Sequence, residues 1–234
     1  MAQGNELSLA IQGWKHHFKH PHRIVIIGAK SSHLIKEDVA FVFKRRFPDY
    51  LEGQYLPHLD ILSKLRAGLE AYPCERFIYA CDDIYAVNDF GLEEVECLKV
   101  QDWVMPDVAD DEPNGWWRDL AKTKSLCKSL FLDLHNWVCH LPVLFDAEKF
   151  VRLVDWTGCA HESYVFENLY YNHYFKGRIP LVLKKDNPFR YSVQNEGDLT
   201  GIDAAFRSKI WITNSVNGWS EALEAKLWQH YDSL

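Results

Sequence analysis

Two adjacent carboxylates, Asp82 and Asp83, directly follow an apolar run at positions 76–81 that we expect to be a buried strand. Side chains alternate between the faces of a strand, but at its end the backbone turns and both carboxylates can reach one site. Neighbouring carboxylates repel each other unless they are protonated or bound to a cation. A divalent cation such as Mg²⁺ or Mn²⁺ takes one or two carboxylates and completes its shell with phosphate oxygens and water. The pair therefore predicts either a metal site beside a phosphorylated ligand or a turn capped by aspartate.

His140 is a further candidate ligand, and the Leu-Pro dipeptide after it is expected to hold this segment in an extended conformation. Its imidazole would complete a metal site with the aspartates or bind a sugar hydroxyl; a half-buried histidine with ordinary hydrogen-bond partners is the alternative. A zinc site is a weaker candidate, because the spacings of its ligands match no standard structural zinc pattern. Those ligands would be Cys127, Cys139, His140, Cys159 and His161.

Three positions are candidates for contact with phosphate. Gly28 ends an expected strand and Lys30 follows it, whereas Lys64 lies on an expected helix ahead of the aspartate pair. A lysine binds phosphate as a compact positive charge, although a lysine on a helix is more often only solvated. Trp116 and Trp117 fall in an acidic segment that we expect to be a loop. There they would either stack on a sugar or hold the loop against the core.

The elements that must position these residues follow from the hydrophobic periodicity. We expect an amphipathic helix at 5–18, strands at 23–29 and 38–43, a helix at 58–72 and a strand at 76–83. This order predicts an α/β layered domain with parallel strands, in which ligands gather outside the carboxyl ends of the strands.

The second half of the chain is expected to be richer in helices. Expected helices cover 120–134, the end of 135–156, where Asp146 would be the N-cap, 161–175, and the C-terminal segment after Ser220. Tyrosine and phenylalanine are frequent in the segment 161–175, and we expect them to belong mostly to the core.

The composition describes a globular protein: 47% of the 234 residues are hydrophobic and 14% aromatic, with a net charge of −7. Positions 1–50 carry eight basic and four acidic residues, whereas positions 51–120 carry five basic and sixteen acidic ones. An acidic chain of this kind does not favour a broad nucleic-acid surface. The six cysteines form no C-x-x-C pair, so we expect reduced thiols in a cytoplasmic protein. No signal peptide and no apolar run long enough for a membrane span are found.

The sequence also lacks the motifs of several enzyme classes. It contains no G-x-x-x-x-G-K-[ST], G-x-S-x-G, H-E-x-x-H or G-x-G-x-x-G. P-loop, serine-hydrolase, zincin and dinucleotide-binding functions are therefore less favoured.

Several segments, in their order along the chain, resemble small glycosyltransferases of bacteriophages and bacterial polysaccharide loci with a GT-A, nucleotide-diphospho-sugar-transferase fold. The chain is similar, more distantly, to Stealth sugar-phosphate transferases, which have a strand ending in Asn-Asp-Asp and a later His-x-Pro. The resemblance covers most of the chain and implies one GT-A-like domain over 1–234. This would be a three-layer α/β/α domain with a mixed, mostly parallel sheet, a nucleotide and metal half at 1–99, and an acceptor half at 100–234. The segments are NELSLAIQGWKHHF, RIVIIGAK, HLDILSKLRAGLE, RFIYACDDIY, HLPVLFDAEKF, ENLYYNHYF and NGWSEALEAKL.

The resemblance implies a metal-dependent transfer of a sugar from a nucleotide-sugar, with a UDP-sugar expected, to a hydroxyl acceptor such as a glycan. Asp82, Asp83 and His140 would hold Mn²⁺ or Mg²⁺, with Asp83 the more direct ligand. Gly28, Lys30, Lys64 and Asn172 would contact the donor. Inversion at the anomeric carbon needs a general base, for which Asp133, Asp146 and Glu162 are alternatives.

Other functions stay open at this point. A Stealth-like transferase would move a sugar 1-phosphate instead of a sugar, and modified phage DNA is a further acceptor, one that the acidic charge does not favour. Related proteins begin with a strand that binds the nucleotide base, whereas only MAQG precedes the first matching segment here. This difference favours a third alternative, a nucleotide- or sugar-binding protein without turnover. Cys81 also replaces the asparagine that usually precedes the aspartate pair.

Overall fold

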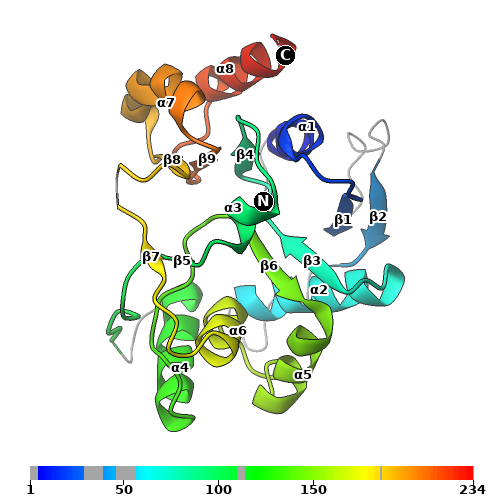
Figure 1. Ribbon diagram of the computed structural model, residues 1–234, viewed down its shortest axis with the longest axis vertical. Helices are drawn as coiled ribbons and strands as arrows, with labels where there is room; N and C mark the ends of the chain where they lie inside the picture. The colour runs from blue at the N-terminus through cyan, green and yellow to red at the C-terminus, as the bar shows by residue number, and fades with distance from the viewer. Residues whose placement is uncertain (1–4, 29–38, 46–55, 110–113, 185, 234) are drawn as a thin grey trace.

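The computed structural model describes residues 5–28, 39–45, 56–109, 114–184 and 186–233. Over these residues the chain is a mixed α/β protein, which confirms the expected class (Figure 1). The helices are α1 (Glu6–His17), α2 (Pro57–Ala71), α3 (Leu92–Glu96), α4 (Gly115–Ser129), α5 (Ala147–Thr157), α6 (Phe166–Tyr174), α7 (Ile202–Ser208), α8 (Glu221–Asp232) and the 3₁₀ helix η2 (Glu196–Gly201). The strands are β1 (Val25–Gly28), β2 (Ala40–Phe43), β3 (Arg76–Tyr79), β4 (Ile84–Ala86), β5 (Lys99–Val100), β6 (Val143–Asp146), β7 (Leu181–Val182), β8 (Arg190–Val193) and β9 (Trp211–Asn214).

The described strands pair in four small sheets. β1 and β2 are parallel, as are β5 and β7, whereas β3 pairs antiparallel with β6. In the largest sheet β9 lies between β4, which is antiparallel to it, and β8, which is parallel. The parallel arrangement expected for the first three strands therefore holds for β1 and β2. β3 takes a different partner, from the second half of the chain.

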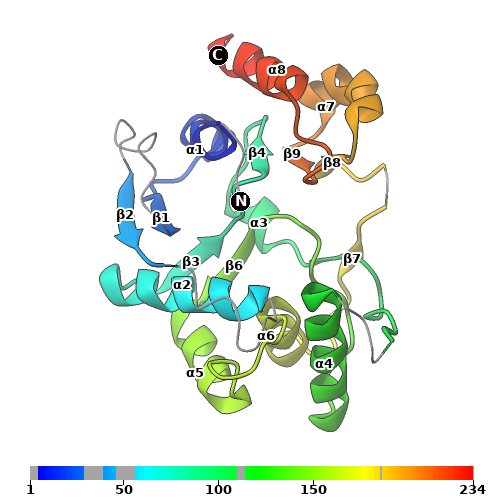
Figure 2. The ribbon, with the colours of Figure 1, turned by 180° about the vertical axis from the view of Figure 1, so that it is seen from behind.

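Two groups of elements lie at opposite ends of the molecule (Figures 1 and 2). Helices α2, α4, α5 and α6 surround β3 and β6 at one end. Helices α1, α7 and α8 surround β4, β8 and β9 at the other end. Each group has its own cluster of buried apolar side chains, and a third cluster lies between β4, α3 and the segment before β6.

Aromatic rings fill the core around β6. The side chains of Phe145, Phe150 and Phe166 are fully buried, and the centroid of the Phe145 ring lies 5.1 Å from that of Phe150. The expected halves 1–99 and 100–234 stay a prediction. This cluster takes Leu62 from the first half and the phenylalanines from the second, so its core crosses the expected boundary.

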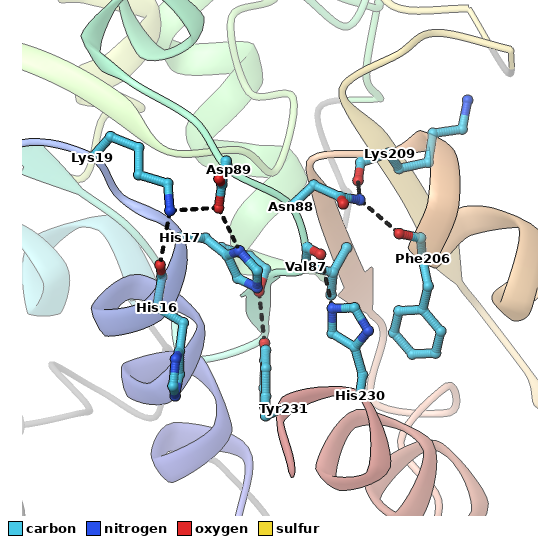
Figure 3. Close-up of polar contacts among 11 residues, drawn as sticks. His16, His17, Lys19, Val87, Asn88, Asp89, Phe206, Lys209, His230 and Tyr231 are labelled. Carbon is cyan, nitrogen blue, oxygen red and sulfur yellow. Dashed lines mark hydrogen bonds and ion pairs between the residues drawn. The ribbon is translucent and has the colours of Figure 1, made fainter. Parts of the chain in front are cut away.

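The N-terminal and C-terminal helices meet on β4 (Figure 3). Tyr231 of α8 donates a hydrogen bond to the carbonyl oxygen of Ala86 at 2.8 Å, and His230 Nε2 lies 2.8 Å from the carbonyl oxygen of Val87. α1 can approach this closely because it presents Gly13, where a Cβ atom would lie 2.6 Å from the hydroxyl oxygen of Tyr231. His17 of α1 packs against His230, with ring centroids 5.9 Å apart.

Helix caps explain several expected boundaries. The side chain of Asp146 accepts a hydrogen bond from Lys149 N at 2.9 Å and starts α5, as predicted. Ser220 accepts one from Leu223 N at 3.2 Å and starts α8, also as predicted. The prediction of a loop at Trp116 and Trp117 is wrong, because both residues lie in α4. Asn114 caps α4, so Trp116 lies in the first turn of the helix, where its ring packs 4.2 Å from that of His58.

Candidate functional site

The antiparallel pairing of β3 with β6 brings the aspartate pair to His140. Tyr79 faces Val143 at the end of this ladder, so residues that follow Tyr79 lie beside residues that precede Val143. Asp82 and Asp83 occupy the turn that leads from β3 to β4. The turn predicted as one alternative is therefore present, and it brings the carboxylate of Asp83 to a histidine.

Asp83 and His140 are in direct contact. Oδ2 of Asp83 lies 2.9 Å from Nε2 of His140, with side-chain exposures of 25% and 40%. The other carboxylate oxygen, Oδ1 of Asp83, is buried and has no hydrogen-bond partner. The backbone at Asp83 is held by β9, because Asn214 N donates a hydrogen bond to the Asp83 carbonyl oxygen at 3.3 Å. The site therefore has one carboxylate oxygen on the imidazole and one oxygen left for another partner.

The backbone of His140 differs from the expected extended conformation. Its φ is 51°, in the left-handed region that residues other than glycine rarely adopt. The proline restricts Leu141, which directly precedes it, so His140 is free to turn. A left-handed residue costs about 1–2 kcal/mol relative to the right-handed helical region. Such conformations cluster at functional sites, where surrounding contacts hold them.

Asp82 is exposed, whereas the preceding Cys81 is half-buried. Desolvation of the carboxyl group raises the pKa of Asp82, and the charge of Asp83 raises it further, while the positive charge of Lys64 acts in the opposite direction. Burial also raises the pKa of the Cys81 thiol, whose sulfur lies 3.2 Å from the hydroxyl oxygen of Tyr79. Cys81 is therefore a neutral thiol beneath the aspartate turn.

The predicted phosphate-binding residues differ in their surroundings. Lys64 lies on α2, and its Nζ is 2.5 Å from Oδ2 of Asp60, one turn earlier. Gly28 is the last residue of β1, with open space where a Cβ atom would lie, and its carbonyl accepts a hydrogen bond from Lys44 N at 3.0 Å. Lys30 lies outside the described residues. For all three, contact with a donor stays a prediction.

Asn172 is completely buried on α6, and both polar atoms of its side chain form hydrogen bonds. Oδ1 accepts from Trp137 Nε1 at 2.9 Å and from His135 N at 3.1 Å, and Nδ2 donates to the His135 carbonyl at 2.9 Å. These bonds hold the segment that leads to His140. Its predicted contact with a donor is untested.

The three candidate bases each have a local partner. Asp133 accepts a hydrogen bond from Gly177 N at 2.6 Å, Asp146 caps α5, and Glu162 lies 3.6 Å from Lys122 Nζ. These contacts do not select one of them as the base, so the alternatives stay as they were.

Arg190 is a site residue that the sequence analysis missed. It is the first residue of β8, and one of its terminal nitrogens donates to the carbonyl of Cys139, which directly precedes His140. The other terminal nitrogen donates to Oε1 of Gln101 at 3.2 Å. A single arginine outside any motif gives no signal in the sequence, because its position depends on pairing between β8 and β9.

A buried polar network behind the site was also missed. His58 Nδ1 and Ser163 Oγ lie 2.7 Å and 2.5 Å from the same oxygen of Asp119. Nε2 of His58 and Oε2 of Glu167 are both buried without hydrogen-bond partners. Burial raises the pKa of Glu167, although the nearby charge of His58 partly opposes the shift. The hydrogen bonds of this network join α2 and α4 to the segment that precedes α6.

Among the described residues, no group of three or more histidine, cysteine, aspartate or glutamate side chains is placed to hold a metal ion. This includes the residues of the zinc alternative. All six cysteines are free thiols.

No helix within the described ranges is long and apolar enough to cross a membrane. The class that the described structure defines is a mixed α/β protein. In comparisons of the sequence with known proteins, no family model and no curated protein matches the chain.

Proposed function

We propose that this chain is a metal-dependent glycosyltransferase of the GT-A type, which moves a sugar from a nucleotide-sugar to a hydroxyl acceptor. The contact between Asp83 and His140 carries this proposal. These residues come from two motifs, the aspartate pair and the later His-x-Pro, that the more distant resemblance to Stealth transferases also contains. Their meeting at one strand end supports a shared role in binding.

An unpartnered oxygen of Asp83 supports a divalent cation at this site. Asp83 Oδ1 is buried without a partner, and an uncompensated buried carboxylate oxygen is costly unless a cation or a hydrogen-bond donor satisfies it. Asp83 and His140 would hold Mn²⁺ or Mg²⁺, with Asp82 beside them. A bound ion of this kind neutralises negative charge on a departing diphosphate.

The remaining polar groups would position the substrates. Lys64 on α2 supplies positive charge near Asp82, and its bond to Asp60 keeps the side chain oriented. The bonds from Asn172 to the His135 backbone would help to hold the segment that leads to His140. An active site of fixed geometry lowers the reorganisation needed during reaction.

A thermal melt with Mn²⁺ and a panel of nucleoside diphosphates tests the proposal. A ligand that binds only the folded state raises the midpoint by mass action. The proposal requires a rise that needs metal and nucleotide together and that is absent from Asp83→Asn. Asp155→Asn is the matched control, because this aspartate is exposed and lies on α5. If no nucleotide raises the midpoint together with Mn²⁺, the proposed donor site is refuted.

Reaction products decide which group is transferred. Incubation with a UDP-sugar and an acceptor should release UDP, detected by chromatography. Release of UMP instead would identify transfer of a sugar 1-phosphate. Nucleotide binding without any donor turnover would identify the binding protein without catalysis.

A further inference from the structure

Arg190 is a half-buried cation whose partners are all neutral. Its guanidinium donates to the Cys139 carbonyl and to the Gln101 side chain, and no carboxylate pairs with it among the described residues. Burial lowers the pKa of Arg190, and the Cys139 thiol opposes this shift. Burying a cation without a counter-charge is unfavourable. The site therefore has a positive group that lacks a negative partner.

A second cation lies close by. Lys99 is 5% exposed, and its Nζ donates to the carbonyls of Glu94 and Cys97 and lies 4.8 Å from the centre of the Phe189 ring. The positive charges of Lys99 and Arg190 both act on the Cys139 thiol between them. The segment before His140 is therefore flanked by two cations bound only through neutral groups.

These cations come from other elements than Lys64: Lys99 lies in β5, Arg190 in β8 and Lys64 on α2. β8 lies near α7 and α8 at one end of the molecule, whereas α2 lies beside β3 and β6 (Figures 1 and 2). His140 precedes β6 and contacts Asp83. Arg190 thus places a positive charge at the residue that directly precedes His140.

We propose that the guanidinium of Arg190 binds an oxyanion, a phosphate or carboxylate group of a ligand, next to His140. Fixing the Cys139 carbonyl requires only a neutral donor, whereas arginine adds a permanent charge and a planar fork that matches two oxygens of an oxyanion. An acidic group on the sugar acceptor or the donor diphosphate can supply these oxygens. The location of the anion within a transferase site rests on the proposed function, but anion binding is testable without metal, donor or turnover.

The first experiment is calorimetric titration of the full chain with pyrophosphate, and with glucuronate as the carboxylate probe, in metal-free buffer. Wild type should bind at least one of them. Arg190→Gln should lose about tenfold or more in affinity, because it removes the positive charge and the charge-assisted hydrogen bonds to the anion. Arg152→Gln is the matched control, since Arg152 is an exposed arginine on α5 that pairs with Glu148, and its affinity should equal that of wild type.

A purely structural role for Arg190 predicts a different result. Arg190→Gln would then lower the melting midpoint without changing the affinity for either anion, and this result would overturn the proposal. The proposal would also be overturned if wild type bound neither probe. If Arg190→Gln does not fold, Arg190→Lys replaces it: the charge remains but the fork is lost, so pyrophosphate should bind more weakly, and unchanged affinity would overturn the proposal.

Competition then identifies the source of the oxyanion. If a nucleoside diphosphate with Mn²⁺ displaces the anion, the group at Arg190 belongs to the donor. If both bind together, it belongs to the acceptor, and glucuronate should bind more tightly than neutral glucose. A chain that binds anions through Arg190 but shows no joint effect of metal and nucleotide would retain this inference while refuting the proposed function.

Discussion

His140 Nε2 lies 2.9 Å from Asp83 Oδ2, although 57 positions separate the two residues in the sequence. The contact depends on the antiparallel register of β3 and β6, which places the exit of one strand beside the entry to the other. A shift of this register by one residue would turn Phe145 out of the core, so burial of the core fixes the contact. Packing of the aromatic core thus determines the geometry of a polar site at its edge.

The left-handed backbone of His140 predicts that a glycine at this position is more stabilising than an alanine. Glycine adopts positive φ at no steric cost, whereas alanine does not. His140→Gly should therefore be more stable than His140→Ala by about 1 kcal/mol, measured by urea unfolding. Both variants lose the contact with Asp83, so the difference isolates the backbone. Equal stabilities would mean that residue 140 takes another conformation in solution.

Asp146 should act on stability as a helix cap. Asp146→Ala should lower the free energy of unfolding by about 1 kcal/mol, because it removes the acceptor for Lys149 N. Asp146→Asn keeps an acceptor and should cost much less. Ser220→Ala at the start of α8 removes a similar cap and is the comparison variant. If Asp146 were also the general base, Asp146→Asn would keep its stability but lose turnover.

The contact between α1 and α8 should weaken in acid. Burial lowers the pKa of His17 below 6.5, although the hydrogen bond to Asp89 partly opposes this shift, and His230 and Lys19 lower it further (Figure 3). The unfolded chain then binds more protons than the folded one as the pH falls below 6.5. The contribution of His17 to stability is complete above that pH. It is lost as the pH falls toward the pKa of His17 in the folded chain.

Unfolding by urea at about pH 7.5 and about pH 5.5 measures this effect. His17→Gln should reduce the difference in stability between the two pH values, whereas His16→Gln, at an exposed neighbouring position, should leave it unchanged. Burial also lowers the pKa of His173, which therefore adds to the wild-type slope in the same direction. An identical slope in wild type and His17→Gln would contradict the assignment to His17.

Phe145 should be among the most sensitive core positions. Its side chain is fully buried between Phe77 and Phe150, with ring centroids 5.3 Å and 5.1 Å away. Phe145→Ala should lower the free energy of unfolding by about 3–5 kcal/mol. Phe131→Ala, at a residue that is 82% exposed, should change it by about 0.5 kcal/mol or less. Similar effects at the two positions would contradict the assigned packing of β6.

Hydrophobic periodicity predicted the longer elements well. α1, α2, α5, α6 and α8 all lie where apolar spacing and capping residues placed helices. The short strands β8 and β9 and the helix α7 were not predicted. Short segments carry little periodicity, and β8 and β9 form because each pairs with a strand elsewhere in the chain.

Local sequence alone determined the α/β class, the helix starts at Asp146 and Ser220, and the choice of Asp82, Asp83 and His140 as candidate ligands. These features depend on neighbours within a few residues. Only the tertiary structure decided that β3 pairs with β6, that His140 turns left-handed toward Asp83, and that Arg190 lies behind it. Strand pairing is a contact between distant segments, and the burial of whole side-chain clusters selects it.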